Sequence, residues 1–435
     1  YTLRASVLTE DVAEIDGEAF MAQSSRRLSP KVRFTGGKYV YDLNGDNVLD
    51  EKDVQLISDY CAGTHDFTEQ ELALLDFDEN GTVDTADGYV YLLLLEGGEY
   101  KDVDLFAATF EVPAGGKLTV QASITLSDAD RAYLDGNFEN GVYVEGFVYA
   151  DAENGNNLSL PFLGFYGNWT SPSMFEHATY YNDEISYSGG VMTVLGRVGD
   201  NSIGLGLNPF ATDDSFLPDR AAISNTNTGA IGSVSKLTYT LIRNAASLEI
   251  KLASGKDTLL SQKTQAISKA YYNAGTTSWI GRNYSATIGW AGLGADKQPL
   301  PENTKAELSI TALPEYVGKT DPAGTTWTLP ITIDNTAPTL VEGKDGTLNA
   351  ENRTLSFTAQ DNQYIAAVLL LDSTGSRVMQ RIAANQMTAG EEKDFVLDLS
   401  DVRTTLCYIA LADYAMNVRV YRVDLSSITP VIEKG

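Results

Sequence analysis

The chain has little of what several functional classes need. It carries 31 Lys and Arg against 59 Asp and Glu, for a formal net charge of -28. So acidic a protein is a poor partner for nucleic acid or an anionic membrane, because both are bound through clustered basic side chains. Its longest apolar run, near Tyr89 to Leu95, is far shorter than the roughly 20 residues that span a bilayer. We therefore expect no nucleic-acid partner and no direct membrane insertion.

Cysteine and histidine are also scarce, with two of each. Cys61 and Cys407 fall in segments that we assign to different modules, so we expect two buried free thiols and no disulfide. A Ser-His-Asp site needs a histidine base, and neither His65 nor His177 stands near a nucleophile motif. Zinc-ligand spacing, phosphate loops and a Gly-x-Ser-x-Gly elbow are absent from the sequence. The chain by itself is predicted to have no catalytic residues.

What is present is a β pattern. Polar and apolar residues alternate in Lys117 to Leu126, Val142 to Tyr149 and Lys236 to Leu252, and Gly, Asn, Asp and Pro clusters separate such segments. This pattern is typical of antiparallel strands joined by turns. Since 435 residues are too many for one hydrophobic core, we predict a mainly β chain of consecutive β-sandwiches.

One region breaks the alternation. Between Asp42 and Gly98 the apolar residues follow a helical period, for example at Val54, Ile57 and Tyr60. The region holds many acidic residues and one lysine, Lys52, a balance that favours self-repulsion unless cations bind. We predict a small helical insert.

Two acidic loops in this insert have the spacing of calcium ligands. They read Asp42-Leu-Asn-Gly-Asp-Asn-Val-Leu-Asp-Glu-Lys-Asp53 and Asp76-Phe-Asp-Glu-Asn-Gly-Thr-Val-Asp-Thr-Ala-Asp87. Oxygen donors stand at positions 1, 3, 5, 9 and 12, and Ca²⁺ takes six to eight oxygens. The predicted ligands, including the Val48 and Thr82 carbonyls and water-mediated contacts from Asp50 and Asp84, are Asp42, Asn44, Asp46, Val48, Asp50, Asp53, Asp76, Asp78, Asn80, Thr82, Asp84 and Asp87. The sequence thus predicts two Ca²⁺ ions.

Position 6 of each loop must turn sharply, which Gly81 does freely and Asn47 does at some cost. Position 12 is Asp in both loops, where EF-hands usually have Glu. This variant resembles the dockerin module. The resemblance implies a helix after each loop, here Asp50 to Tyr60 and Thr85 to Leu95, and a cohesin as a possible partner; a purely structural calcium clamp is the alternative.

The β segments resemble another family. Val112-Pro-Ala-Gly-Gly-Lys117, Asn140-Gly-Val-Tyr-Val-Glu-Gly-Phe-Val148 and Leu160-Pro-Phe-Leu-Gly-Phe-Tyr-Gly-Asn-Trp169 follow one another. The series resembles the first fibronectin type III-like domain after the catalytic domain of lactocepin-like cell-envelope subtilisins, the group that includes the complement peptidases. Asp334-Asn-Thr-Ala-Pro338, Asp361-Asn-Gln-Tyr364 and Asp413-Tyr-Ala-Met-Asn417 resemble its later domains. We expect the aromatic side chains of the first series to pack in a core.

The resemblance implies three fibronectin III/immunoglobulin-like sandwiches with a dockerin-like insert in the first. The expected domains are 1–40 with 99–172, then 41–98, 173–337 and 338–435. It further implies that a subtilisin-like serine protease domain precedes Tyr1, that these modules position it and help select protein substrates, and that the protein is extracellular at the cell envelope or wall.

Two alternatives stay open. One is an adhesin or scaffold module that binds a cohesin with no protease attached. The other is a carbohydrate-binding sandwich that stacks sugars on Trp279, Trp290 or Trp327; exposed coplanar rings favour it, and burial contradicts it.

Overall fold

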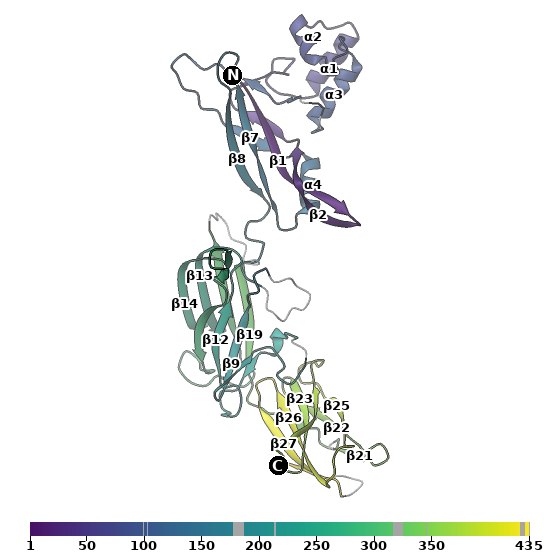
Figure 1. Ribbon diagram of the computed structural model, residues 1–435, viewed down its shortest axis with the longest axis vertical. Helices are drawn as coiled ribbons and strands as arrows, with labels where there is room; N and C mark the ends of the chain where they lie inside the picture. The colour runs from purple at the N-terminus through teal and green to yellow at the C-terminus, as the bar shows by residue number, and fades with distance from the viewer. Residues whose placement is uncertain are drawn as a thin grey trace. The chain divides into compact units, whose positions relative to one another are not determined.

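The chain folds into two compact units, Tyr1–Trp169 and Thr170–Gly435. The computed structural model describes residues 1–98, 100–101, 103–176, 187–212, 215–315, 325–344, 346–426 and 431–434. Strands dominate both units, which confirms the mainly β prediction (Figure 1). Among the described helices, none is long and apolar enough to cross a membrane. The finer division into four domains stays a prediction.

One main sheet organises the first unit, in the order β4-β5-β1-β7-β8, with β2 also paired to β1. Strand β1 pairs antiparallel with β7 from Thr2 opposite Asp151 to Thr9 opposite Val144, so the chain before and after the helical region shares one sheet. A separate ribbon joins β3 to β6. The bounds are β1 (Thr2–Ile15), β2 (Glu18–Leu28), β3 (Lys31–Phe34), β4 (Lys38–Tyr39), β5 (Ala108–Thr109), β6 (Ala122–Thr125), β7 (Val142–Asp151) and β8 (Leu158–Tyr166).

Local sequence signals explain two further features of this unit. The β1–β2 turn has Asp16 and Gly17 at positive φ, 55° and 83°, which suits a two-residue hairpin turn because it matches the twist of the strands. Helix α4 (Asp128–Asn137) begins at a capping box, in which the Ser127 side chain accepts from the backbone of Asp130 and the Asp130 side chain accepts in return. The sequence analysis did not predict α4.

The two faces of β7 differ. Val142 and Gly146 are buried and Val144 and Val148 are half-buried, as expected for residues that share one face. The opposite face carries Tyr143, which meets the rings of Phe165 (5.6 Å between centroids) and Trp169 (6.3 Å) edge to face. The core prediction therefore holds only in part. Phe162 and Tyr166 pack against buried residues, whereas Phe165 and Trp169 form a partly exposed cluster on the outer face.

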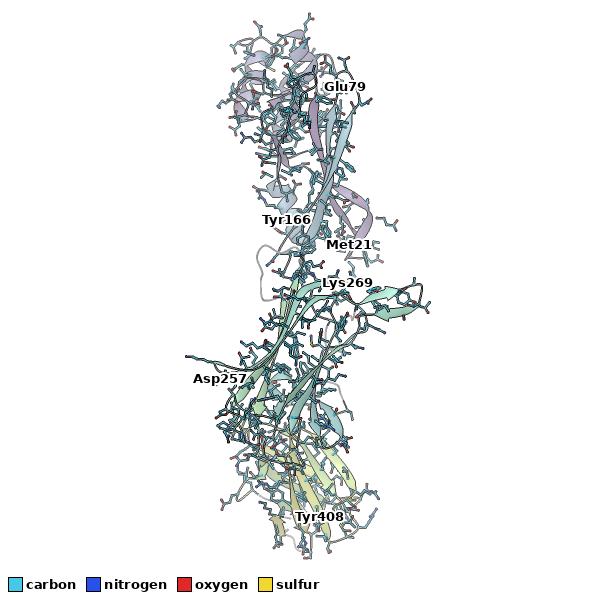
Figure 2. All side chains as sticks on the ribbon, turned by 90° about the vertical axis from the view of Figure 1, so that its left-hand side faces the viewer. Met21, Glu79, Tyr166, Asp257, Lys269 and Tyr408 are labelled. Carbon is cyan, nitrogen blue, oxygen red and sulfur yellow. The ribbon has the colours of Figure 1, made fainter. Side chains whose placement is uncertain are left out.

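The helical region has a small core of its own. It contains α1 (Glu51–Cys61), α2 (Glu69–Leu75) and α3 (Thr85–Leu95), gathered at the end of the unit where β1 begins (Figure 1). Ile57, Leu75 and Tyr91 are fully buried in this core, and Leu105 joins it from the chain that leads back to the sheet. Figure 2 shows Glu79 at this helical end, whereas Met21 on β2 and Tyr166 on β8 lie toward the other end of the unit.

The second unit begins with two sheets that enclose one core. Their orders are β10-β9-β12-β17 and β11-β19-β18-β13-β14. Leu237 of β12 and Ile310 of β18, both fully buried, belong to the shared core. The bounds are β9 (Thr193–Val198), β10 (Asn201–Gly204), β11 (Ala222–Ile223), β12 (Ser233–Tyr239), β13 (Ala245–Ser254), β14 (Asp257–Ile267), β17 (Tyr284–Trp290), β18 (Lys305–Pro314) and β19 (Thr326–Ile333), with the hairpin β15 (Tyr271–Asn273) and β16 (Ser278–Ile280) and the short η1 (Pro218–Arg220).

A second sandwich with its own core completes this unit. Strand β22 pairs with β20, β21 and β25, and a five-stranded sheet runs β24-β23-β26-β27-β28. Leu355, Val368 and Ile409 lie in the core between them. The bounds are β20 (Thr339–Leu340), β21 (Thr347–Asn349), β22 (Thr354–Gln360), β23 (Ile365–Leu371), β24 (Val378–Ala383), β25 (Lys393–Asp398), β26 (Leu406–Asp413), β27 (Val418–Asp424) and β28 (Val431–Lys434).

The two cysteines are both free, as predicted, but they differ in exposure. Cys407 on β26 is buried, whereas Cys61 at the end of α1 is exposed. The expectation that both thiols are buried is wrong for Cys61, because the last residue of a surface helix is not covered by a neighbouring element.

Candidate calcium-binding site

The two acidic loops lead directly into helices α1 and α3. Asp50 is the N-cap of α1 and Asp84 is the N-cap of α3. Each forms a capping box with the residue at position 12 of its loop, Asp53 or Asp87, whose side chain accepts from the N-cap backbone. The final residue of each loop is therefore held at the first turn of the helix, and its carboxylate is aimed back toward the loop.

In the first loop, side-chain oxygens accept backbone N–H groups from within the loop. The carboxylate of Asp42 accepts from Gly45 (2.9 Å) and Asn47 (2.7 Å). The Asn44 side chain accepts from Asp46 N (2.7 Å), and the Asp53 carboxylate accepts from Leu43 N (2.9 Å). These bonds turn positions 1, 3 and 12 inward, toward the space that the loop encloses.

The second loop repeats this arrangement. Asp76 accepts from Asn80 N (3.0 Å) and Gly81 N (2.9 Å), and Asp87 accepts from Phe77 N (2.8 Å). Asp76, Asp78 and Asp87 each offer a carboxylate oxygen, and these oxygens lie within 4.8 Å of one another. Oxygens that share one Ca²⁺ at about 2.3–2.6 Å are at most about 5 Å apart, so the second loop has the dimensions of a calcium site.

Both loops place residues in the left-handed region at positions 4 and 6. The φ angles are 75° at Gly45 and 61° at Asn47 in the first loop, and 64° at Glu79 and 88° at Gly81 in the second. The left-handed turn predicted at Asn47 is confirmed. Each loop thus has glycine at one of the two positions and a side-chain residue in the less favourable conformation at the other.

The loops differ in the charge beside their ligands. In the first loop the Lys52 ammonium lies 3.3 Å from Asp46 Oδ2 and 3.2 Å from Asp50 Oδ2. Position 11 of the second loop is Ala86, which has no charge. A cation bound in the first loop would share these two carboxylates with a lysine, so the two loops are not equivalent.

The residue at position 12 is buried in both loops. Asp53 and Asp87 are fully buried. Burial raises the pKa of Asp53, and hydrogen bonds from the N–H groups of Asp50, Leu43 and Asn44 oppose that rise. The buried Tyr91 hydroxyl donates to the Tyr41 carbonyl at 2.7 Å, one residue before the first ligand position. These contacts tie the start and the end of the first loop to the helical core.

The remaining predicted ligands are the residues at positions 7 and 9 of each loop and Asn80 at position 5 of the second. Asp50 and Asp84 use one carboxylate oxygen each to cap a helix, accepting from Lys52 N (2.8 Å) and Ala86 N (2.7 Å). Val48 and Thr82 occupy position 7 of their loops, and Asn80 accepts from Thr82 N at 2.9 Å. The second loop brings Asp76, Asp78 and Asp87 together, whereas among the described residues no three carboxylates of the first loop lie within the same 4.8 Å of one another. Their binding of calcium stays a prediction.

A second acidic cluster, which sequence reasoning did not assign to a site, lies in the second unit. Asp334, Asp361 and Asp413 are all buried, and one carboxylate oxygen from each lies within 4.8 Å of the others. Asp334 follows β19, Asp361 follows β22, and Asp413 ends β26. The three positions had been noted only as motifs of a family resemblance.

The tryptophans do not form the shared platform that sugar stacking needs. Trp290 is buried and donates to the Leu293 carbonyl at 2.8 Å. Trp327 is half-buried against the same core, and Trp279 meets Tyr272 edge to face, with an interplanar angle of 69°. Of the two histidines, His65 packs against Phe67, and His177 lies outside the described residues.

Comparisons with known proteins agree with the family resemblance. A sequence profile described as an Fn3-like domain matches residues 65–163. A PI-type proteinase of Lactococcus lactis subsp. cremoris is 26% identical over 288 residues, which are 64% of this chain and 14% of that proteinase. A PII-type proteinase of Lacticaseibacillus paracasei is 25% identical over 212 residues, 47% of this chain and 11% of the proteinase. These relatives are cell-envelope proteinases of the lactocepin type, so the predicted resemblance is confirmed.

Two limits follow from these matches. The chain spans only a small part of its relatives' length, 14% of the PI-type proteinase. The profile match begins inside the helical region, between α1 and α2, and ends in β8. A solved exo-chitosanase, CsxA of Amycolatopsis orientalis, aligns over 43% of this chain and 25% of that chain at 11% identity, with a TM-score of 0.17, too low to carry an argument.

Proposed function

We propose that this chain is a non-catalytic accessory region of a secreted or cell-envelope subtilisin-like serine protease, in which it positions the protease and contributes to the selection of protein substrates. The observation that supports this most is the similarity to lactocepin-type proteinases over 288 residues, 64% of the chain. The folded sandwiches fit such a role, since their well-packed cores offer a rigid framework. The extracellular, cell-envelope location belongs to the same proposal.

The experiment compares the parent protease with and without these modules. Deleting the region is expected to lower kcat/KM for folded protein substrates by tenfold or more, because their contacts extend beyond the active site, while a short chromogenic peptide is cleaved as before. The isolated chain is expected to cleave neither substrate. Equal rates on the protein substrate with and without the region contradict a role in selection.

We further propose that the helical region is a dockerin-like clamp holding two Ca²⁺ ions. The support is the convergence of Asp76, Asp78 and Asp87 within 4.8 Å and the same hydrogen-bonding pattern in the first loop. Calcium is expected to rigidify the insert and to fix it on the first sandwich. Two hydrogen bonds connect the chain just before the first loop to its surroundings. The Tyr41 carbonyl accepts from the Tyr91 hydroxyl of α3, and Val40 N donates to the Ala107 carbonyl at 2.9 Å, beside β5 of the main sheet.

Calorimetric titration of the chelated chain with calcium tests this clamp. Asp46→Ala and Asp78→Ala each remove one ligand from one loop, and each is expected to abolish or strongly weaken one binding event. Glu51→Ala and Glu79→Ala remove the same charge from neighbouring exposed positions that supply no ligand, and are expected to leave both events in place. Equal protease resistance between Asp42 and Gly98 with calcium and with chelator contradicts the clamp.

A second candidate function for the insert is binding a cohesin. A surface groove between α1 and α3 favours it, and Tyr89 on its rim is 66% exposed. The groove is lined by Val54, Ile57, Ser58, Cys61, Thr85, Gly88, Tyr89 and Leu92. Exposed aromatic side chains beside apolar grooves are frequent anchors of protein interfaces.

In binding assays against a panel of cohesins, Tyr89→Ala is expected to weaken any complex at least tenfold, whereas Tyr143→Ala on β7 leaves it unchanged. Absence of binding to every cohesin leaves the purely structural clamp.

A further inference from the structure

The acidic cluster of the second unit joins three distant parts of the chain. Asp334 stands in the connection from the first sandwich of this unit to the next, while Asp361 and Asp413 belong to the second sandwich. The exposed fractions of these three residues are 1%, 7% and 0%. Three carboxylates thus share a small space from which water is largely excluded, at the junction of two β-sandwiches.

Their charge has no basic counterpart among the described residues. None of the ion pairs found there includes any of the three. The terminal nitrogens of the neighbouring Arg220 donate elsewhere, to the carbonyls of Ala384 (3.2 Å) and Met387 (3.1 Å) and to the Tyr414 hydroxyl (3.0 Å), and its Nε is buried without a hydrogen-bond partner. Burying unpaired carboxylates is costly, so a protein that keeps three of them together must compensate for the charge.

Hydrogen bonds supply only part of that compensation, and all of the donors are neutral. Asp413 accepts from the backbone and the side chain of Asn417, both at 2.8 Å. Asp334 Oδ1 accepts from Thr336 N and Asn362 Nδ2, both at the long distance of 3.3 Å. Asp361 Oδ2 accepts from Gln363 N at 2.8 Å, but Asp361 Oδ1 is buried with no hydrogen-bond partner at all.

The orphaned oxygen is an observation separate from the clustering. A fully buried acceptor without a donor is uncommon in folded proteins, and it is usually explained by a bound ligand, water or ion. The next residue, Asn362, repeats it, since its side-chain oxygen is also buried and unpartnered. Two consecutive residues at this junction thus each have a buried side-chain oxygen without a hydrogen-bond partner.

The burial of the three carboxyl groups also shifts their pKa values. Burial, together with the charge of Asp361 and of Glu302, raises the pKa of Asp334 to about 8. Burial also raises the pKa of Asp361 to about 6, and that of Asp413 rises well above its usual value from burial and from the neighbouring Asp334. Among the residues that the structure describes, no basic side chain opposes these shifts. A cation among the three carboxylates would oppose them.

We propose that Asp334, Asp361 and Asp413 form a third calcium site, independent of the helical loops, which fastens the last β-sandwich to the one before it. The donors are all oxygen, which selects a hard cation over zinc or copper. The mutual distances of at most 4.8 Å fit one central ion at calcium–oxygen distances of about 2.3–2.6 Å. The Asn362 side-chain amide lies beside the cluster, with Nδ2 3.3 Å from Asp334 Oδ1, and its oxygen has no hydrogen-bond partner.

Such an ion would act on a junction that is already polar. Asn417 is fully buried, and its side chain donates to the Asp334 carbonyl (2.8 Å) while accepting from Asn227 Nδ2 (3.0 Å). Asn417 therefore connects one ligand residue of each sandwich to a loop of the first. Binding the ion rigidifies this connection, because its ligands come from both sides of the junction.

The first test counts ions. Titration of a chelated chain that carries Asp46→Ala and Asp78→Ala in the loops is expected to reveal one remaining calcium, and adding Asp361→Asn is expected to remove it. Asp401→Asn, an exposed position in the same sandwich, serves as the matched control and is expected to keep the ion. Identical binding with and without Asp361→Asn overturns the proposal. The loops can fail to bind calcium without affecting this comparison.

The second test uses the sign of a stability change. In chelator, Asp361→Asn is expected to keep or raise the melting temperature of the second unit, because it removes one of three repelling carboxylates. In millimolar calcium the same variant is expected to melt at a lower temperature than the parent, because it loses the ion. A variant that changes the melting temperature equally in both buffers contradicts the site.

A third measurement localises the effect. Cys407 is buried on β26, the strand that ends at Asp413, and in a Cys61→Ser chain it is the remaining thiol. Calcium at a hundredfold excess over its Kd is expected to slow the labelling of Cys407 by up to about a hundredfold, because labelling requires opening of the unit that binds the ion. Asp361→Asn is expected to abolish this protection. Labelling at the same rate with calcium and with chelator rules the site out.

Discussion

The chain contains two kinds of acidic cluster, and they differ in how the fold tolerates them. The loops before α1 and α3 are each one continuous segment at the surface, and most of their carboxylates remain in contact with water. The cluster of Asp334, Asp361 and Asp413 is assembled from three segments and is buried. Water screens the first kind, whereas the second depends on protons, hydrogen bonds or a cation. Loss of calcium is therefore expected to loosen the loops but to destabilise the whole junction.

The largest expected difference between the two kinds comes from removing one carboxylate from each. Asp413→Ala leaves the buried backbone N–H of Asn417 and one of its two side-chain N–H groups without an acceptor, and it should lower the free energy of unfolding of the second unit in calcium by about 3 kcal/mol. Asp46→Ala removes an exposed side chain and should leave the stability in chelator nearly unchanged. Denaturant titrations of both variants check the contrast, and equal losses break it.

The two free thiols provide reporters of the same contrast. Burial raises the pKa of Cys407 to about 11, so at pH 8 it holds far less thiolate than an ordinary cysteine, and its side chain is covered as well. Cys61 is exposed at the end of α1. In calcium, a thiol reagent should label Cys61 more than about a hundredfold faster than Cys407. Comparable rates, measured by mass spectrometry after proteolysis, contradict the described burial of β26.

How much of this was predictable follows from where the ligands stand in the sequence. The loops could be found without a structure, because all the predicted ligands of each loop, such as Asp42 and Asp53, lie within twelve consecutive residues. The buried cluster could not, since 27 and 52 residues separate its members, on the numbering of Asp334, Asp361 and Asp413, and only strand pairing brings them together. A signal was present, because each aspartate follows or ends a largely buried strand, where a charge is unexpected.

The outer aromatic face shows a second limit of pattern reasoning. Alternation along β7 predicts two faces but does not say which is covered, and the sequence analysis assigned all the aromatics of β8 to a core. In the structure Phe162 packs inward, while Phe165 faces outward with Tyr143 and Trp169. Hydrophobic character alone did not distinguish them, because an apolar side chain suits either a core or an exposed patch.

A smaller effect sharpens the comparison within the first unit. Tyr91→Phe removes the hydroxyl that donates to the Tyr41 carbonyl at 2.7 Å and should cost about 1 kcal/mol. Because that carbonyl precedes Asp42, calcium affinity should fall at the first loop and stay constant at the second. Calorimetry of Tyr91→Phe against Tyr89→Phe, an exposed tyrosine of the same helix, checks this; equal weakening of both loops contradicts this role of the hydrogen bond.

The smallest expected effect concerns Lys52, which lies beside two carboxylates of the first loop. Lys52→Gln should raise the calcium affinity of that loop two- to threefold at low ionic strength, because the ion no longer shares Asp46 and Asp50 with an ammonium group. The gain should shrink at high salt, since the charge is exposed. An affinity that stays the same or falls shows that Lys52 does not compete with the ion.

The most direct measurement is a long-wavelength anomalous difference map from crystals grown in calcium. Three peaks are expected: one among Asp42, Asp46 and Asp53, one among Asp76, Asp78 and Asp87, and one among Asp334, Asp361 and Asp413. Oxygen ligands at about 2.3–2.6 Å should surround each peak. A map of sufficient quality to locate the methionine sulfurs, but with no peak at any of the three positions, would contradict calcium binding by this chain.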